Sequence, residues 1–196
     1  MPLLNNRTRE ISTKIVYYGP GFSGKTTNLQ FIHNQLSPTT RGDLISMATQ
    51  TDRTLSFDFL PLDIGSIKGW QVRFAMFTVP GQVEYNASRK LILNGVDAIV
   101  FVSDSDPARR IDNFESLENM ALNLADFELS LDKMPWVMQH NKRDLSTAMT
   151  LEQMELDMNT LGVPSFESIA TEGLGVFATL RAVSKLLMEE LATFVA

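Results

Sequence analysis

The sequence predicts an α/β protein with a mostly parallel six-stranded sheet, one antiparallel edge strand and helices on both faces. Three observations support this prediction. Segments of strand length alternate with segments in which apolar residues recur at helical spacing, as in right-handed β-α-β units. The later strands are almost continuously apolar, which is typical of strands buried on both faces. Polar clusters follow strands at their carboxyl ends, where such sheets bind ligands.

The first predicted strand covers residues 10–18 and leads into a glycine-rich stretch. Apolar residues then recur at helical spacing, at Leu29, Ile32 and Leu36. The chain therefore begins with a strand, a loop and a helix.

The next two predicted strands form an antiparallel hairpin. Apolar and polar residues alternate along residues 54–62, and a turn-rich segment connects this strand to residues 70–79. Pro61 has no N–H to donate to a sheet ladder. We therefore expect residues 54–62 to be the edge strand.

The second half of the chain continues the alternation of strands and helices. Buried strands are predicted in the segments 96–104, 134–144 and 163–173, and the last two end in polar clusters. The helix after the first of these strands should bury one face, formed by Phe114, Leu117, Ala121 and Leu124. The last helix should bury Phe177, Leu180, Ser184, Leu187 and Leu191.

Length and composition favour one domain, residues 1–196. The chain is 44% hydrophobic, which is enough for one sizeable core. It contains no cysteine, so disulfides and thiolate metal sites are excluded and a reducing compartment such as the cytoplasm is expected. A net charge of −6 argues against nucleic acid as a partner.

The termini show no targeting or anchoring pattern. The first residues lack the apolar core of a secretory signal, and no apolar run approaches the roughly 20 residues of a membrane span. Pro2 and the cysteine-free carboxyl terminus exclude myristoylation and prenylation patterns. We expect no direct lipid anchor and membrane association only through partners.

The glycine-rich stretch, Gly19 to Thr26, matches the P-loop pattern of nucleotide-binding proteins, with a strand before it and a helix after it. Its backbone N–H groups and the helix N-terminus can bind phosphate oxygens. Lys25 can reach the β- and γ-phosphates, and the Thr26 hydroxyl can ligate Mg²⁺. The alternative is a glycine-rich turn with a solvated lysine. The residues expected to bind the nucleotide here are Gly19, Gly21, Phe22, Ser23, Gly24, Lys25, Thr26 and Thr27.

A second motif, Asn141 to Asp144, indicates which base is bound. The Asp144 carboxylate only accepts hydrogen bonds, and guanine presents a ring N–H and an amine on one edge. Adenine has no such pair of donors, so it would leave the carboxylate unpaired. Asn141, Lys142 and Asp144 are therefore candidate guanine-binding residues.

With these motifs the chain resembles the Ras-like small GTPases, and more closely the MglA branch of bacterial gliding-motility and cell-polarity GTPases. The resemblance runs from about residue 9 to the last helix. The branch is indicated mainly by "TVPGQVEYNASRKLIL" and "RTLSFDFLPLDIG". It implies a P-loop NTPase small G-domain, which binds GTP or GDP with Mg²⁺ and hydrolyses GTP.

The switch II motif departs from the usual family pattern. Thr78 stands where an aspartate normally holds a Mg²⁺-bound water, so we expect weaker coupling to Mg²⁺. MglA-type sequences share this departure. Pro80 precedes Gly81, whose N–H is the family's γ-phosphate contact, and Gln82 matches the glutamine that orients the attacking water.

The switch I segment offers several threonines. Thr54 is the favoured ligand of Mg²⁺ and the γ-phosphate, and Thr51 and Thr49 are weaker alternatives. The resemblance marks Arg53 as an arginine finger supplied in cis. The implied metal ligands are Thr26 and Thr54, and the implied catalytic residues are Gln82, Arg53 and Lys25.

The last nucleotide contact that the resemblance implies is the backbone N–H of Ala170, which would meet guanine O6. Thr171 and Glu172 depart from the usual Ala-Lys ending, so only this backbone role is carried over.

The resemblance also implies partners. Hydrolysis should be slow alone and faster with an MglB-like roadblock protein, and polarity or motility effectors should bind the GTP state, with recruitment to a cell pole through such partners. Two alternatives stay open from the residues alone. One is a GTP-dependent scaffold that does not hydrolyse, and the other is a P-loop nucleotide kinase.

Other candidates have structural interpretations. His33 and His140 lack metal-site spacing and should be structural. Asp104, Asp106 and Asp112 lack EF-hand spacing, so we expect a solvated turn and a helix cap.

Overall fold

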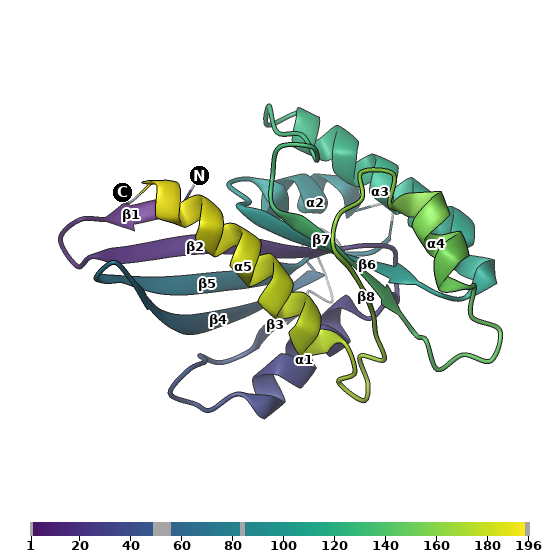
Figure 1. Ribbon diagram of the computed structural model, residues 1–196, viewed down its shortest axis with the longest axis horizontal. Helices are drawn as coiled ribbons and strands as arrows, with labels where there is room; N and C mark the ends of the chain where they lie inside the picture. Colours follow the sequence, from purple (N-terminus) through teal and green to yellow (C-terminus); the bar gives the residue numbers. More distant parts are fainter. Residues whose placement is uncertain (1, 49–55, 83–84, 195–196) are drawn as a thin grey trace.

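The computed structural model describes residues 2–48, 56–82 and 85–194. Its centre is a twisted sheet in the order β3-β4-β5-β2-β6-β7-β8, with β1 paired to the start of β2 (Figure 1). The strands are β1 (Leu3–Asn5), β2 (Glu10–Tyr18), β3 (Ile45–Ala48), β4 (Ser56–Ile67), β5 (Trp70–Thr78), β6 (Ala98–Asp104), β7 (Trp136–Asn141) and β8 (Ser165–Glu167).

Strand directions confirm the predicted mostly parallel sheet. Strands β5, β2, β6, β7 and β8 are parallel, and β4 runs antiparallel to β5. The sheet has eight strands in the described ranges, two more than predicted. The additional strands are the short strands β1 and β3. Segments of three or four residues are too short to show an apolar alternation.

The edge of the sheet differs from the prediction. Strand β3 pairs antiparallel with the first half of β4, so β4 is not the edge strand there. Pro61 lies beyond the end of β3, where its carbonyl accepts a hydrogen bond from the Gly42 N–H at 2.9 Å. Pro61 therefore lies between β5 and the segment that precedes β3, and not at an edge. The predicted turn at residues 64–69 is largely strand, and only Lys68 and Gly69 separate β4 from β5.

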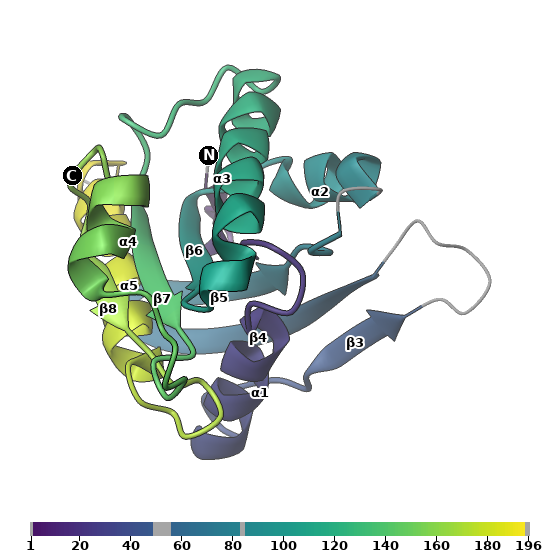
Figure 2. The ribbon, with the colours of Figure 1, turned by 90° about the vertical axis from the view of Figure 1, so that its right-hand side faces the viewer.

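Helices cover both faces of the sheet, as predicted (Figures 1 and 2). Helices α1 (Lys25–Gln35) and α5 (Val176–Phe194) pack on one face, and α2 (Asn86–Leu93), α3 (Arg110–Ala125) and α4 (Leu151–Met158) pack on the other. The sheet has a hydrophobic core on each face, and successive side chains of β2 pack alternately into the two cores. Ile15 and Tyr17 face α1 and α5, whereas Val16 and Tyr18 face α2, α3 and α4. None of the helices in the described ranges is both long and apolar enough to cross a membrane.

Helix α3 buries a different face from the one predicted. Of the predicted apolar positions only Leu124 is fully buried, whereas Phe114 is 38% exposed. The buried face instead contains Asn113, Ser116 and Asn123, together with Met120 and Leu124. Hydrogen bonds explain this choice, because Asn113 bonds the backbone of Asp104 in both directions, at 2.9 and 2.8 Å.

Candidate nucleotide-binding site

Most of the predicted site residues that the structure describes lie at one edge of the sheet. The five parallel strands bring their carboxyl ends to this edge, where open α/β sheets bind ligands. The P-loop follows β2, Thr78 ends β5, and Asn141 ends β7. Because β4 is antiparallel to β5, Asp58 near its beginning reaches the same edge.

The P-loop forms a tight turn into α1. Gly24 has a φ of 101°, and a Cβ there would lie only 2.1 Å from Nδ2 of Asn141. Glycine is therefore required both by the backbone conformation and by the close approach. Among the residues that the structure describes, no side chain caps the N-terminus of α1. The first-turn N–H groups have no partner within the helix and favour an anion.

Lys25 binds the loop itself in this structure. Its ammonium group donates to the carbonyl oxygens of Gly19 and Pro20, at 3.0 and 2.6 Å. Burial lowers the pKa of Lys25 to about 7, and the nearby charges of Arg89 and Arg109 also lower it, while Asp58 opposes them. A polyanion near this lysine would have the opposite effect.

One side-chain amide joins three predicted nucleotide-binding segments. Asn141 donates from Nδ2 to the carbonyl of Ser23 in the P-loop at 2.7 Å. Its Oδ1 accepts the backbone N–H of Ala170 at 2.9 Å. Guanine O6 would have to share this N–H or replace Asn141 as its acceptor. The P-loop and the base motif are thus fixed relative to one another.

The other two base-motif residues, Lys142 and Asp144, have different surroundings. Lys142 pairs with Asp104 at 2.6 Å, and Asp104 is fully buried. The expectation that Asp104 lies in a solvated turn is therefore wrong, whereas Asp106 does cap η2 (Pro107–Arg109), accepting the N–H of Ala108. Asp144 is exposed, and none of the described residues donates to it. Its carboxylate is available to a ligand.

The predicted metal ligand Thr26 contacts a carboxylate that sequence analysis missed. The Thr26 hydroxyl donates to Asp58 at 2.6 Å. Thr78 donates to the same oxygen at 2.8 Å and accepts the Asp58 N–H at 2.8 Å. Ser46 donates to the other oxygen at 2.7 Å. Asp58 thus lies beside Thr78, which stands where the family usually has an aspartate.

These oxygen donors fit Mg²⁺ in chemical type. Mg²⁺ prefers oxygen ligands, keeps several waters and usually relies on substrate phosphates rather than an all-protein cage. No cluster of three or more metal-binding His, Asp or Glu residues occurs in the ranges that the structure describes. Thr26 and Asp58 fit a metal shared with phosphate oxygens.

Asp58 carries a recognisable sequence signal. It alternates with Phe57 and Phe59 and therefore lies on the same strand face as Leu60 and Leu62, both of which are buried. A carboxylate on the core face of a strand needs partners. That position, rather than any motif, distinguishes it.

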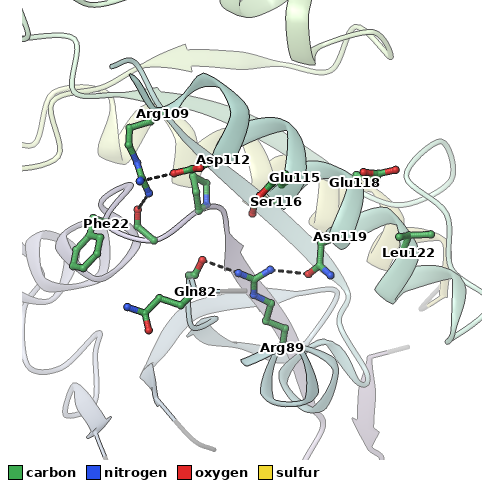
Figure 3. Close-up of a pocket in the computed structure, with 13 residues that line it drawn as sticks. Phe22, Gln82, Arg89, Arg109, Asp112, Glu115, Ser116, Glu118, Asn119 and Leu122 are labelled. Carbon is green, nitrogen blue, oxygen red and sulfur yellow. Dashed lines mark hydrogen bonds and ion pairs between the residues drawn. The ribbon is translucent and has the colours of Figure 1, made fainter. Parts of the chain in front are cut away.

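The switch residues are only partly described. Arg53, Thr54 and the alternatives Thr49 and Thr51 lie outside the described residues. Gln82 is exposed, and together with Gly81 it lines a cavity of about 540 Å³ between the P-loop, α2 and α3 (Figure 3).

Two arginines that sequence analysis did not place in the site also line this cavity. Arg109 donates to the carbonyl of Gly21 at 2.8 Å and pairs with Asp112, so Asp112 is not simply solvated. Arg89 lies at the floor, between switch II and α3.

The histidines have structural partners. His140 is buried between Ser103 and Glu155, at 2.8 and 2.9 Å, and burial lowers its pKa. His33 contacts Arg41. Neither belongs to the site, as expected.

Comparison with known proteins identifies the family. The ADP-ribosylation factor family matches residues 3–191 of the chain. The chain belongs to this family of small GTPases. The mutual gliding-motility protein MglA of Myxococcus xanthus (strain DK1622) is 55% identical to it over 191 residues, which cover 97% of the chain and 98% of MglA.

The comparison confirms the resemblance to the Ras-like small GTPases and to MglA. It also confirms the fold class, a small G-domain with a mostly parallel sheet. Family membership implies binding of GTP and GDP and, in general, GTP hydrolysis. The chain is therefore a small GTPase of MglA type, and the nucleotide-kinase alternative loses its support.

Proposed function

We propose that this small GTPase is a molecular switch, which binds GTP with Mg²⁺, hydrolyses it to GDP and phosphate, and regulates cell polarity or motility through nucleotide-dependent effector binding. The observation that supports it most is the double hydrogen bond of Asn141 to Ser23 and Ala170. This amide fixes the spacing between the phosphate end and the base end of one ligand.

The residues divide the work of binding and chemistry. The P-loop amides and Lys25 bind the phosphates, while Asn141, Lys142 and Asp144 select guanine. Thr26 and Thr54 would hold Mg²⁺, which would supply positive charge that stabilises the phosphate oxygens. Gly81 donates to the γ-phosphate. Asp58 takes the role of the missing switch II aspartate, because its carboxylate already contacts Thr26.

Hydrolysis depends on orientation and electrostatic stabilisation. Gln82 orients the attacking water, and Arg53 neutralises charge that develops on the transferred phosphoryl group. Loss of the γ-phosphate then releases the contacts that order the two switch segments. GTP hydrolysis by the chain alone is slow, and an activating partner that positions Arg53 and Gln82 accelerates it.

The identity with MglA supports the biological assignment. By this relationship the activating partner is an MglB-like roadblock-domain protein, and the effectors belong to polarity or motility machinery. The protein acts in the cytoplasm and reaches a membrane or cell pole through partners.

A nucleotide competition assay tests the binding function. We expect unlabelled GTP and GDP to displace a fluorescent GTP analogue in the presence of Mg²⁺, whereas ATP does not displace it. Omission of Mg²⁺ should weaken GTP binding. Equal displacement by ATP and GTP would contradict the proposal.

Hydrolysis assays distinguish the switch hypothesis from the hypothesis of a non-hydrolysing scaffold. The second hypothesis is motivated by Thr78, which stands in place of the usual switch II aspartate. We expect multiple-turnover phosphate release that a roadblock partner accelerates. Gln82→Leu should lower the single-turnover rate by about 10²-fold, the lower end of the range for a positioned acid–base group, while GDP affinity is kept. An unchanged rate in this variant would show that Gln82 does not position the water.

A further inference from the structure

Arg89 is a buried cation that the proposed chemistry does not yet use. It lies on α2 and is only 1% exposed. Its guanidinium packs over the ring of Tyr18, with 5.6 Å between Cζ and the ring centroid. In the ranges that the structure describes, no carboxylate pairs with it. A buried guanidinium is costly unless its donors are satisfied, so its acceptors indicate why it is there.

The acceptors of Arg89 are the backbone carbonyls that directly precede Gln82. Nε donates to the oxygen of Pro80 at 2.9 Å, and Nη2 donates to the oxygen of Gly81 at 2.7 Å. Nη1 donates to Oδ1 of Asn119 on α3 at 2.7 Å (Figure 3). One planar group therefore connects two successive switch II peptides to a fixed helix. A guanidinium suits this task because its donors lie in a rigid fork.

Gly81 also lies directly against the P-loop. A Cβ on Gly81 would lie 2.3 Å from Cα of Gly21 and 2.5 Å from its nitrogen. Gly81 is therefore held both by its hydrogen bond to Arg89 and by its close approach to the phosphate-binding loop.

Peptide geometry translates these bonds into an orientation. No cis peptide bond occurs in the described residues, and the C=O and N–H of a trans peptide point in opposite directions. Because Arg89 binds the Pro80 oxygen, the Gly81 N–H of that peptide points away from Arg89. Its hydrogen bond to the Gly81 oxygen likewise fixes the orientation of the peptide plane between Gly81 and Gln82.

We propose that Arg89 is a positioning residue for GTP hydrolysis, which sets the Gly81 N–H toward the γ-phosphate and sets Gln82 toward the attacking water. This inference rests on the proposed GTPase function. Arg89 touches neither the phosphates nor the water, and it acts through the two carbonyls that it holds. Removing it should therefore lower the rate of hydrolysis and leave the binding of GDP, which lacks the γ-phosphate, nearly unchanged.

The main test compares Arg89→Met with Arg89→Lys. In Arg89→Met, single-turnover hydrolysis should fall about ten- to hundredfold, as expected for the loss of one or two charge-assisted hydrogen bonds. GDP affinity should change less than about threefold, because the P-loop and base motif keep their contacts. Arg89→Lys should fall in between, because an ammonium lacks the rigid fork that binds both carbonyls. The matched control is Arg110→Met, since Arg110 is an exposed arginine that pairs with Asp157 away from the site.

The cavity beside Arg89 permits a second test by chemical rescue. Its volume of about 540 Å³ is ample for free guanidinium, and Arg89 is part of its lining. Millimolar guanidinium should restore much of the hydrolysis rate in Arg89→Ala and none in Gln82→Leu. Rescue of the rate distinguishes positioning from a packing role, which a small cation would not replace.

The outcomes separate this inference from the proposed function. Failure of the unaltered chain to bind or hydrolyse GTP would overturn the proposed function. If the unaltered chain is active, an unchanged rate in folded Arg89→Met would overturn the positioning role. So would a loss of GDP and GTP affinity equal to the loss in rate, without rescue by guanidinium. If the Met and Ala variants do not fold, Arg89→Lys decides alone, by a lowered rate at unchanged GDP affinity or by no such difference.

Discussion

The two ends of the candidate site satisfy their polar groups in different ways. At the base end, Asn141 binds backbone groups of Ser23 and Ala170, and the free carboxylate of Asp144 faces solvent. At the phosphate end, Lys25 binds carbonyls of its own loop, and Thr26 donates to Asp58. The base end thus keeps one candidate ligand-binding group, the Asp144 carboxylate, open to solvent, whereas Lys25 and Thr26 at the phosphate end are bonded to other protein groups.

This difference predicts different responses to a nucleotide. Most base-end bonds can remain when guanine binds, so binding there adds contacts to a preorganised frame. At the phosphate end, the proposed roles of Lys25 and Thr26 would require them to exchange their present partners for phosphate and metal oxygens. That exchange makes binding at this end sensitive to charge, Mg²⁺ and pH, as expected for the part of a switch that distinguishes GTP from GDP.

The largest expected effect comes from the base end. Asp144→Asn replaces the carboxylate that we propose accepts two guanine donors by an amide with one acceptor oxygen and no charge. GTP and GDP affinity should both fall by about 10²- to 10⁴-fold, since each hydrogen bond to a charged group contributes about 1.5–3 kcal/mol. Competition binding measures both. If only GTP affinity fell, or if the loss appeared only with Mg²⁺, Asp144 would act on the phosphate end and not on the base.

A smaller effect is expected from the metal side of the phosphate end. Asp58→Asn removes the charge beside Thr26, so GTP affinity in Mg²⁺ should fall by about tenfold, as for one charge-assisted hydrogen bond, with little change in EDTA. Asp63→Asn is the control, because Asp63 lies on the same strand but bonds Gly65 and Gln71. Equal losses with and without Mg²⁺ would contradict the metal role of Asp58.

The smallest effect concerns pH. The pKa of Lys25 is lowered to about 7 in this structure, and a bound triphosphate should raise it. Binding above pH 7 should therefore take up a proton, and GTP affinity should fall about fivefold from pH 7 to pH 8. Calorimetry in buffers of different ionisation enthalpy measures the uptake. Lys25→Arg is the control, because arginine stays charged throughout this range, and equal uptake in both proteins would exclude Lys25 as the source.

Sequence patterns predicted those parts of the site whose functional residues are close together in the sequence. The P-loop from Gly19 to Thr26 and the base motif from Asn141 to Asp144 are local, and the structure places both at the predicted edge of the sheet. Their roles in binding stay predictions until nucleotide assays are made. The same holds for Thr54 and Arg53, which lie outside the described residues.

Residues whose roles depend on distant partners were missed. Asp58 is one strand away from Thr78 and belongs to no motif, so only the antiparallel pairing of β4 with β5 brings them together. Arg89 received no role from the sequence, because its acceptors on Pro80 and Gly81 are known only from the fold. The buried face of α3 was misplaced for the same reason, since its asparagines are buried by hydrogen bonds rather than by apolar packing.

The sequence by itself determined the family, six of the eight described strands and the two nucleotide motifs, because periodicity, glycine placement and motif spacing are properties of short segments. Only the tertiary structure decided which polar side chains are buried and what they hold. A buried polar group is tolerated when a partner satisfies it, and here those partners lie on strands and helices that are far apart in the chain.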